Sequence, residues 1–273
     1  MRGPGLVIAT ISLVFCGAML AQKVQFSAAE KSDVLQRMKN VPETNQERAV
    51  QLKELFAAAG CSGNSLTEQK IEGTETPNII CRLGAGEGDT VIVGAHYDHA
   101  SSIQRPQDNW SGASLLPALY QSLRHKKRNH SFVFVAFADH DNSPAGAEFF
   151  ARHLSRSALD HSEAMVNIDA LGLSPTKVWA AHSDKDLVQA LIVMVYALKL
   201  PASQIDIAAA GNTDSDPFAA RHIPQITIHS LTQQNVSGMN TQFRPNNYYD
   251  TYRLLCGYLA YLDQSLKPRQ HSE

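Results

Sequence analysis

Apolar side chains first recur with a helical period over residues 28–59. Leu52, Leu55 and Phe56 keep the 3.6-residue spacing of a helix that buries one face. Pro42 divides this region into two helices, because proline cannot continue a helix from the preceding turn, and Gly60 ends the second helix. The same pattern predicts four more helices, at 111–124, 146–155, 185–199 and 246–263.

Six short apolar runs between these helices predict β-strands. They are residues 78–83, 91–95, 132–138, 164–168, 177–181 and 224–228. Several runs are apolar on both faces, which is typical of strands covered by helices on each side. The alternation predicts an α/β fold with a single mixed, mostly parallel β-sheet sandwiched by helices. A length of 273 residues, 44% of them hydrophobic, suits one large domain, which we expect over residues 28–268.

The first 21 residues have the pattern of a signal peptide. Arg2 precedes an apolar stretch from Leu6 to Leu20, and the small residues Ala18 and Ala21 offer cleavage points. The stretch is short for a membrane span, although it leaves an uncleaved anchor open. We therefore expect an exported protein, either periplasmic or extracellular.

Charge is nearly balanced, with 24 basic and 26 acidic residues and a formal net charge of −2. A balanced surface gives no electrostatic attraction to nucleic acid or to an anionic membrane. We expect neither partner, apart from the membrane that receives the N-terminal segment. The oligomeric state is left open by the sequence.

Export makes disulfides permissible, because the compartments outside the cytoplasm are oxidising. Cys61 and Cys81 are 20 residues apart and flank a connection rich in Gly, Ser, Asn and Thr. We expect a disulfide between them. The alternative, that Cys61, Cys81 and Cys256 are all buried thiols, stays open at this stage.

Histidine and aspartate follow four of the predicted strands. His96 and Asp98 come after residues 91–95, Asp139–Asp141 after 132–138, Asp169 after 164–168, and His229 after 224–228. In open α/β sheets, ligands bind outside the carboxyl ends of the strands. Four strands that deliver such residues at one edge indicate a functional site.

Imidazoles and carboxylates together are the ligand set of Zn²⁺. Asp108, just before the helix at 111–124, is a further candidate, although an Asp there also suits a helix N-cap. His96 and Asp98 are two residues apart on extended chain, so their side chains point to the same side. This spacing lets Asp98 accept the second ring N–H of His96.

At these residues the chain resembles the zinc aminopeptidases and glutaminyl cyclases, the twenty-eighth family of peptidases. The segments that carry the resemblance are GAHYDH (94–99), DNWSGASLLPAL (108–119), FADHDNSPAGAEFF (137–150), MVNIDALG (165–172) and IPQITIHS (223–230). The resemblance implies a mixed sheet sandwiched by helices, with two zinc ions at the strand ends, and for this chain we expect one or two zinc ions. It also implies that His96, Asp108, Asp141 and Asp169 bind the metal, with Asp108 bridging two ions.

The chain departs from the family pattern in three places. Where the family has a Glu-Glu pair, this chain has His140 and Asp141, so His140 takes the place of the general base and Asp141 that of a ligand. The last ligand of the family is a His after the final strand, whereas residues 233–243 contain none. Asn240 stands nearest to that place, and His229 is the other candidate.

These departures predict a weakened metal site. Aspartate holds its carboxylate one methylene shorter than glutamate, while zinc–oxygen bonds need roughly 2.0–2.2 Å. We expect an exported zinc-dependent exopeptidase of the aminopeptidase type, which hydrolyses peptides with His140 and Asp98 in catalytic roles. Two alternatives stay open: a catalytically inactive binding module, and a single-zinc acyltransferase similar to the glutaminyl cyclases.

Overall fold

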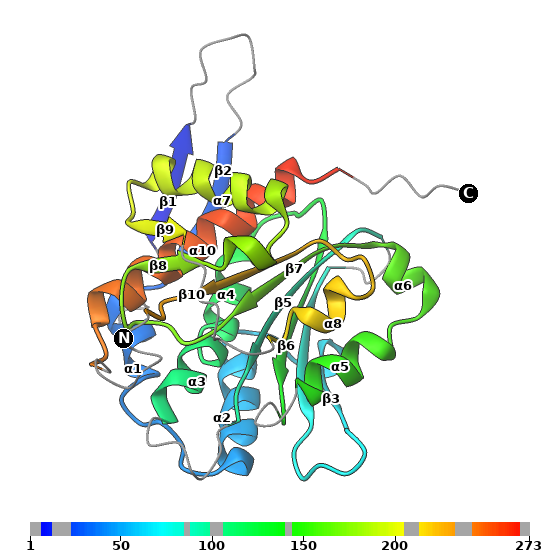
Figure 1. Ribbon diagram of the computed structural model, residues 1–273. Helices are drawn as coiled ribbons and strands as arrows, with labels where there is room; N and C mark the ends of the chain where they lie inside the picture. The colour runs from blue at the N-terminus through cyan, green and yellow to red at the C-terminus, as the bar shows by residue number, and fades with distance from the viewer. Residues whose placement is uncertain are drawn as a thin grey trace.

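The structure is a computed structural model that describes residues 7–12, 23–84, 88–98, 106–139, 144–204, 213–232 and 242–267, with backbone only at 7–12, 23, 106–108 and 204. Two strands, β1 (Val7–Ser12) and β2 (Lys23–Ala28), pair as an antiparallel ribbon. The other eight strands form one sheet in the order β3-β4-β6-β5-β7-β10-β8-β9 (Figure 1). These strands are β3 (Leu66–Gln69), β4 (Asn78–Leu83), β5 (Thr90–His96), β6 (Ser131–Phe137), β7 (Ser162–Ile168), β8 (Thr176–Val178), β9 (Ala202–Gln204) and β10 (Gln225–His229).

The centre of the sheet is parallel. β5 pairs in parallel with β6 on one side and β7 on the other, and β7 pairs in parallel with β10. Antiparallel pairs join β3, β4 and β6 at one side of the sheet and β10 to β8 at the other. The expected mixed, mostly parallel sheet is therefore confirmed, and the carboxyl ends of its four central strands share one edge.

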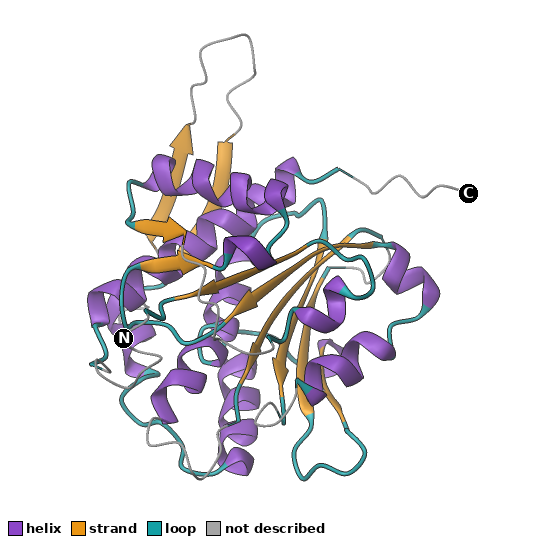
Figure 2. Ribbon diagram, in the orientation of Figure 1, coloured by secondary structure: helices purple, strands orange, loops and turns teal. Residues whose placement is uncertain are grey.

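Helices cover both faces of the sheet, as Figure 2 shows. They are α1 (Lys31–Gln36), α2 (Asn45–Ala58), α3 (Pro106–Ala113), α4 (Leu116–Leu123), α5 (Ala145–Arg152), α6 (Arg156–Asp160), α7 (Lys185–Leu198), α8 (Asp216–Ala219) and α10 (Pro245–Ser265), with 3₁₀ turns at Gly63–Ser65 and Ala180–His182. Helices α2, α4 and α10 cover the first face, and α5 and α8 cover the second. None of the helices in the described ranges combines the length and apolar composition needed to span a bilayer.

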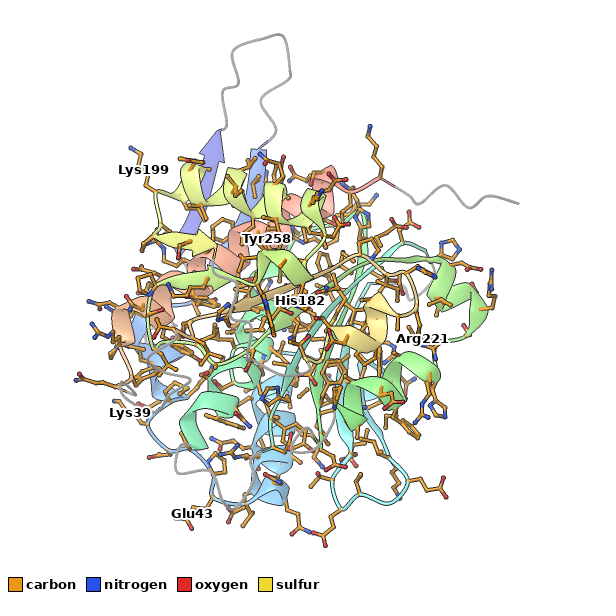
Figure 3. All side chains as sticks on the ribbon, viewed as in Figure 1. Lys39, Glu43, His182, Lys199, Arg221 and Tyr258 are labelled. Carbon is orange, nitrogen blue, oxygen red and sulfur yellow. A yellow bond between two sulfur atoms is a disulfide. The ribbon has the colours of Figure 1, made fainter. Side chains whose placement is uncertain are left out.

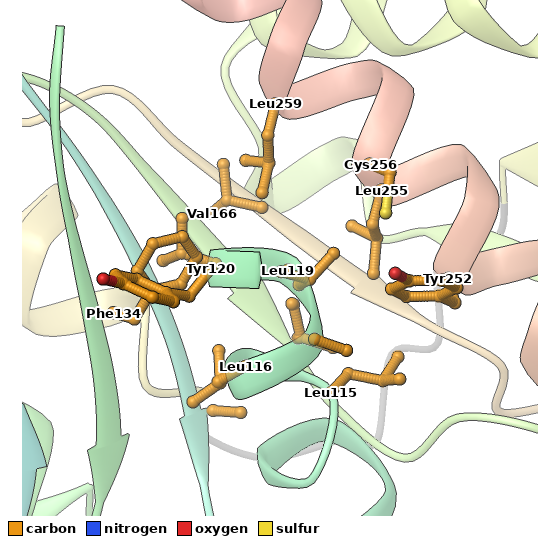
Figure 4. Packing of buried hydrophobic residues seen from close by; sticks show 14 of the residues in the cluster. Leu115, Leu116, Leu119, Tyr120, Phe134, Val166, Tyr252, Leu255, Cys256 and Leu259 are labelled. Atoms are coloured by element: carbon orange, nitrogen blue, oxygen red, sulfur yellow. The ribbon is translucent and has the colours of Figure 1, made fainter. Parts of the chain in front are cut away.

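The larger core lies between the first face and helices α4 and α10. Leu116 and Leu119 of α4 pack near Val166 of β7 and Leu259 of α10, all fully buried (Figure 4). Helix α7 packs on α10, the helix that carries the labelled Tyr258 in Figure 3. The buried hydroxyl of Tyr258 donates to the carbonyl of Leu187 of α7 at 3.0 Å. This layering explains why twelve of the 21 residues of α10 are buried.

The expected helix at 111–124 is two helices. It begins earlier, at Pro106, and breaks between α3 and α4 just before Pro117. Proline lacks the N–H that a helix interior needs, and its ring clashes with the preceding turn, so Pro117 lies in the first turn of a new helix instead of continuing the old one. The break turns α3 toward the carboxyl edge of the sheet while α4 stays in the core.

Short or polar elements escaped the sequence analysis. Strand β3 and strand β9 have only four and three residues and lie at the two edges of the sheet. Strand β2 ends where we expected the domain to begin, at residue 28, yet Val24 and Phe26 are buried in the same core as α4 and α10. The backbone of residues 7–12, within the expected signal peptide, pairs with β2 along its whole length.

The structure contains the predicted Cys61–Cys81 disulfide. The Cα atoms are 6.3 Å apart, and both cysteines are fully buried. The bond ties the end of α2 to the middle of β4, while Cys256 remains a buried free thiol in α10. The disulfide therefore fixes a helix of the first face to the antiparallel side of the sheet.

Replacement of both cysteines, Cys61→Ala with Cys81→Ala, is expected to destabilise the fold by about 3 kcal/mol, because the unfolded chain regains the freedom of a 20-residue loop. For a domain of this size the midpoint of thermal unfolding should fall by roughly 6–12 °C. Differential scanning calorimetry measures it, and the reduced wild-type protein should match the variant. An unchanged midpoint would contradict this role.

Candidate functional site at the carboxyl edge of the sheet

His96 is the last residue of β5 and is 5% exposed. Its Nδ1 lies 2.8 Å from Oδ2 of Asp214, a carboxylate that is itself 1% exposed. Its Nε2 faces Oδ1 of Asp169, just after β7, at 3.9 Å. The two strands are neighbours in the sheet, so their parallel alignment brings His96 and Asp169 together as the sequence suggested.

Acidic neighbours control the ionisation of His96. Burial alone would lower the pKa of the ring, but the charge of Asp214 and its hydrogen bond, with Asp169 and Asp98 adding to them, raise the pKa to about 10. An environment of three carboxylates that holds a proton so firmly also attracts a metal cation. The site is therefore electrostatically suited to a positive ion rather than to an anion.

Asp214 was not foreseen in the sequence. We expected Asp98 to hold the ring of His96, whereas the residue at Nδ1 is Asp214, in the turn before α8. The segment from Thr213 to Pro217 has the composition of an ordinary polar turn. Its two aspartates are the only feature of this segment that could have indicated a functional residue. Asp98 lies beside this pair, is 2% exposed, and contributes charge to His96.

Helix α3 approaches the same edge. The side-chain amide of Asn109 donates to the carbonyl of Asp98 at 2.6 Å, and the Ser111 hydroxyl accepts the N–H of Leu171, just beyond Asp169, at 2.7 Å. A Cβ on Gly112 would come within 2.7 Å of the carbonyl oxygen of Ile168, so only glycine permits this packing. Helix α3 thus bridges the ends of β5 and β7.

Asp108 occupies the third position of α3 rather than its N-cap, because the helix begins at Pro106. The backbone position thus removes the N-cap interpretation. The side chain of Asp108 lies outside the described residues, as do His140, Asp141 and Asn240. Their expected roles as ligands, base and replacement ligand remain predictions.

Arg48 of α2 is fully buried behind the site, and the sequence gave no reason to single it out. Its guanidinium donates to the carbonyls of Tyr97 at 2.7 Å and Pro42 at 3.1 Å, and lies 5.9 Å from the centre of the Trp110 ring in α3. Burial lowers the pKa of Arg48 to about 10, and the charge of Asp98 opposes that shift. Arg48 therefore supplies a buried positive charge beside an acidic site and fixes the chain that follows His96.

His229, at the end of β10, differs from His96 in which nitrogen of the neutral ring carries the proton. Its Nδ1 accepts the backbone N–H of Leu231 at 3.0 Å, so the proton of the neutral ring resides on Nε2. Burial lowers the pKa of His229 to about 4, which keeps the ring neutral. A nitrogen that carries a proton has no lone pair for a metal. While the bond to Leu231 persists, His229 does not replace the missing ligand.

The described residues supply part of a metal site. Two atoms that each bind Zn²⁺ at roughly 2.0–2.2 Å lie about 3.4 Å apart in a regular tetrahedron and at most about 4.4 Å apart. The 3.9 Å between His96 Nε2 and Asp169 Oδ1 falls within this range, so the pair fits a shared ion. Across the described ranges, no three His, Cys, Asp or Glu side chains form a complete metal-binding group.

Two hollows adjoin the same edge near Asp139, the residue that follows β6 by two positions. One, of about 480 Å³, is lined by residues 44–46, 73–76 and Asp139, and the other, of about 380 Å³, by residues 71–74, Asp139 and parts of α5. Asp139 has a left-handed backbone with φ of 57°, which turns the chain sharply out of β6. Both hollows therefore lie beside the carboxyl end of β6.

Comparison with known proteins identifies the family. The model of peptidase family M28 matches residues 78–253, which span β4 to α10 and include His96, Asp169 and Asp214. The chain belongs to peptidase family M28. Zinc is the metal that this family suggests, in agreement with the resemblance noted in the sequence.

Curated relatives match only part of their own length. Aminopeptidase YwaD of Bacillus subtilis is 27% identical over 156 residues, which cover 56% of this chain and 33% of YwaD. The uncharacterised protein YfbL of Escherichia coli is 32% identical over 112 residues, 37% of this chain and 33% of YfbL. The chain thus spans about a third of the length of the curated relatives that it matches.

Solved structures share the fold of this M28 chain. The LapA aminopeptidase of Legionella pneumophila superposes with a TM-score of 0.73 at 15% identity, covering 87% of this chain and 73% of LapA. The glutaminyl cyclase of Porphyromonas gingivalis superposes with a TM-score of 0.64 at 18% identity, covering 86% of this chain and 96% of the cyclase.

Asp214→Asn should weaken zinc binding by about 10- to 100-fold, because the ring of His96 loses the carboxylate that orients it and raises its basicity. Affinity for zinc should also rise with pH in the wild-type protein, since the ring must release its proton to bind metal. In the variant the pKa of His96 is lower, so this rise should be shallower. Competition with a chromophoric chelator between pH 6 and 9 measures the zinc affinity and its dependence on pH.

Asp216→Asn is the matched control, because Asp216 lies two residues away and contacts Thr213 rather than His96. Its zinc affinity should equal that of the wild type. Equal affinities in the wild-type protein and in Asp214→Asn would exclude the positioning role of Asp214.

Proposed function

We propose that this chain is an exported, zinc-dependent hydrolase of the aminopeptidase type, with a metal site weakened by substitution. The observation that carries the proposal is the pair of His96 and Asp169 at the carboxyl edge, 3.9 Å apart, with Asp214 holding the far side of the imidazole. Membership of family M28 and the name of YwaD support the reaction class.

The residues of this chain divide the work as follows. His96 and Asp169, with Asp108 and Asp141 by match to the family, would hold zinc. When bound, zinc supplies positive charge that polarises the scissile carbonyl and activates water. His140, in the place of the family's glutamate, would accept a proton from the attacking water and return it to the leaving amine. Asp214 keeps the imidazole of His96 oriented, and Arg48 steadies the backbone after it.

Three features support a weakened site. Asp141 is shorter than the usual glutamate, residues 233–243 contain no histidine, and the Nε2 of His229 carries a proton. Loss of donors at one position favours the binding of a single ion. That arrangement gives a second candidate function, a single-zinc acyltransferase similar to the glutaminyl cyclases, whose Porphyromonas gingivalis member is covered at 96% of its length.

Export is supported by two independent features. The first 21 residues have the charge and apolar pattern of a leader, and the Cys61–Cys81 disulfide suits an oxidising compartment. Cleavage within this leader would place the mature N-terminus close to the start of β2.

Wild-type protein is expected to hydrolyse leucine p-nitroanilide weakly and to bind about one zinc ion per chain, measured by elemental analysis. The double substitution His140→Glu with Asp141→Glu should raise kcat/KM by at least about tenfold, because a carboxylate base and a longer ligand return together. Recovery should stay partial, since the last histidine is still absent.

His125→Glu, on the exposed surface far from the strand ends, is the control and should leave the rate unchanged. Cyclisation of an N-terminal glutamine with no anilide hydrolysis would favour the acyltransferase instead. Two bound zinc ions with fast hydrolysis by the wild-type protein would refute the weakened site and make His140 a competent base.

A further inference from the structure

The candidate site continues sideways along the sheet into a row of side chains that we name the cross-strand row: His96, Asp169, His229 and Lys177. They belong to or directly follow β5, β7, β10 and β8, four successive strands of the sheet. His229 and Lys177 are paired directly in the antiparallel ladder, so their side chains share a face. Asp169 is joined to β10 through its N–H, which donates to the carbonyl of Ile228 at 2.9 Å.

The two ends of the row have opposite character. Asp169 and Asp214 surround His96 at one end. At the other end, His229 and Lys177 present hydrogen-bond donors, the Nε2–H and the ammonium group. Nε2 of His229 is completely buried, carries the ring proton, and has no hydrogen-bond partner among the described residues. A buried donor without an acceptor is costly, and native structures rarely leave one without a functional reason.

Lys177 adds a cation beside this donor. It is 8% exposed, and its Nζ donates only to the hydroxyl of Ser203 at 3.3 Å, with no carboxylate near it in the described part of the chain. Burial lowers the pKa of Lys177 because water no longer solvates the ammonium group. A ligand that brought a negative charge to this place would satisfy both His229 and Lys177.

We propose that His229 and Lys177 bind the C-terminal carboxylate of a short peptide substrate, so that the enzyme acts on di- and tripeptides. This assignment rests on the proposed function for the position of the scissile bond at His96 and Asp169. A carboxylate accepts from the Nε2–H of His229 and from the ammonium of Lys177, which are charge-assisted hydrogen bonds.

The length of the row sets the length of the peptide. Strands lie about 4.8 Å apart, so Lys177 is about 10 Å from Asp169 along the sheet. The scissile carbonyl and the terminal carboxyl are about 4 Å apart in a dipeptide and about 7 Å apart in a tripeptide cut at its first bond. With a polar contact of about 3 Å at each end, a dipeptide spans about 10 Å, which matches the distance from Lys177 to Asp169. A tripeptide spans about 13 Å, which matches the three strand spacings, about 14 Å, from Lys177 to His96, whereas longer peptides exceed the row.

Binding of leucyl-leucine and of its C-terminal amide, measured by calorimetry on chelator-treated protein, tests the proposal without hydrolysis. Wild-type protein should bind the acid at least about tenfold more tightly than the amide, because only the acid offers a charged acceptor. In Lys177→Met this preference should fall to within about twofold, and Lys177→Arg should retain most of it. Lys185→Met, on the exposed surface of α7, should behave as the wild type.

His229→Gln, which keeps a donor but not the ring geometry, should lose part of the preference and shows whether both residues act together. Unfolding temperatures of all variants separate loss of the subsite from loss of the fold. Equal binding of acid and amide by the wild-type protein, no binding of either, or a preference that survives Lys177→Met would overturn the proposal. Failure of anilide hydrolysis or of zinc binding leaves this comparison intact, so the two proposals fail separately.

Discussion

The parallel alignment of β6, β5, β7 and β10 is the constraint on which the site depends. Because these strands run in one direction, whatever residue follows each of them arrives at the same edge of the sheet. His96 and Asp169 come from β5 and β7, which are hydrogen-bonded neighbours although they are distant in the sequence. The sheet thus positions the chemistry, and the helices protect that alignment by burying both of its faces.

Close packing at Gly112 fixes helix α3, which carries Asp108, against the ends of the aligned strands. Gly112 lets the backbone of α3 approach the carbonyl of Ile168 and the methyl of Ala95 at the same time. Ser111 and Asn109 then add hydrogen bonds to the two strand ends. Arg48 supports the same region from behind, where an apolar side chain would leave the carbonyls of Tyr97 and Pro42 without their donor.

Periodicity predicted the elements that contribute most to the core. Strands β4 to β7 and β10, and helices α2, α5, α7 and α10, lie close to where apolar spacing put them, because each buries a continuous apolar face. Strands β3 and β9 are too short and too exposed to leave such a pattern, and the split at Pro117 was hidden inside an apolar run. The local pattern of apolar residues indicates which segments are buried. It does not indicate the short strands at the edges of the sheet or the restriction that Pro117 places on the backbone.

The site was predictable where residues follow strands and unpredictable where they come from turns. His96, Asp169 and His229 were found by their position after apolar runs. Asp214 was missed because the polar turn around it has no periodicity, and Arg48 because a buried arginine in a helix looks like a surface residue in the sequence. The tautomer of His229 depends on the N–H of Leu231, a contact that only three-dimensional structure reveals.

The position of helix α10 in the sequence affects how the protein folds during its synthesis. It is the last element of the described chain, yet it contacts β2, α1, α4, α7 and β8, and twelve of its residues are buried. Until those residues have been synthesised, β2 and α4 still pack on each other but lack the apolar cover that α10 provides. The nascent polypeptide therefore cannot complete this core on the ribosome before helix α10 has been synthesised.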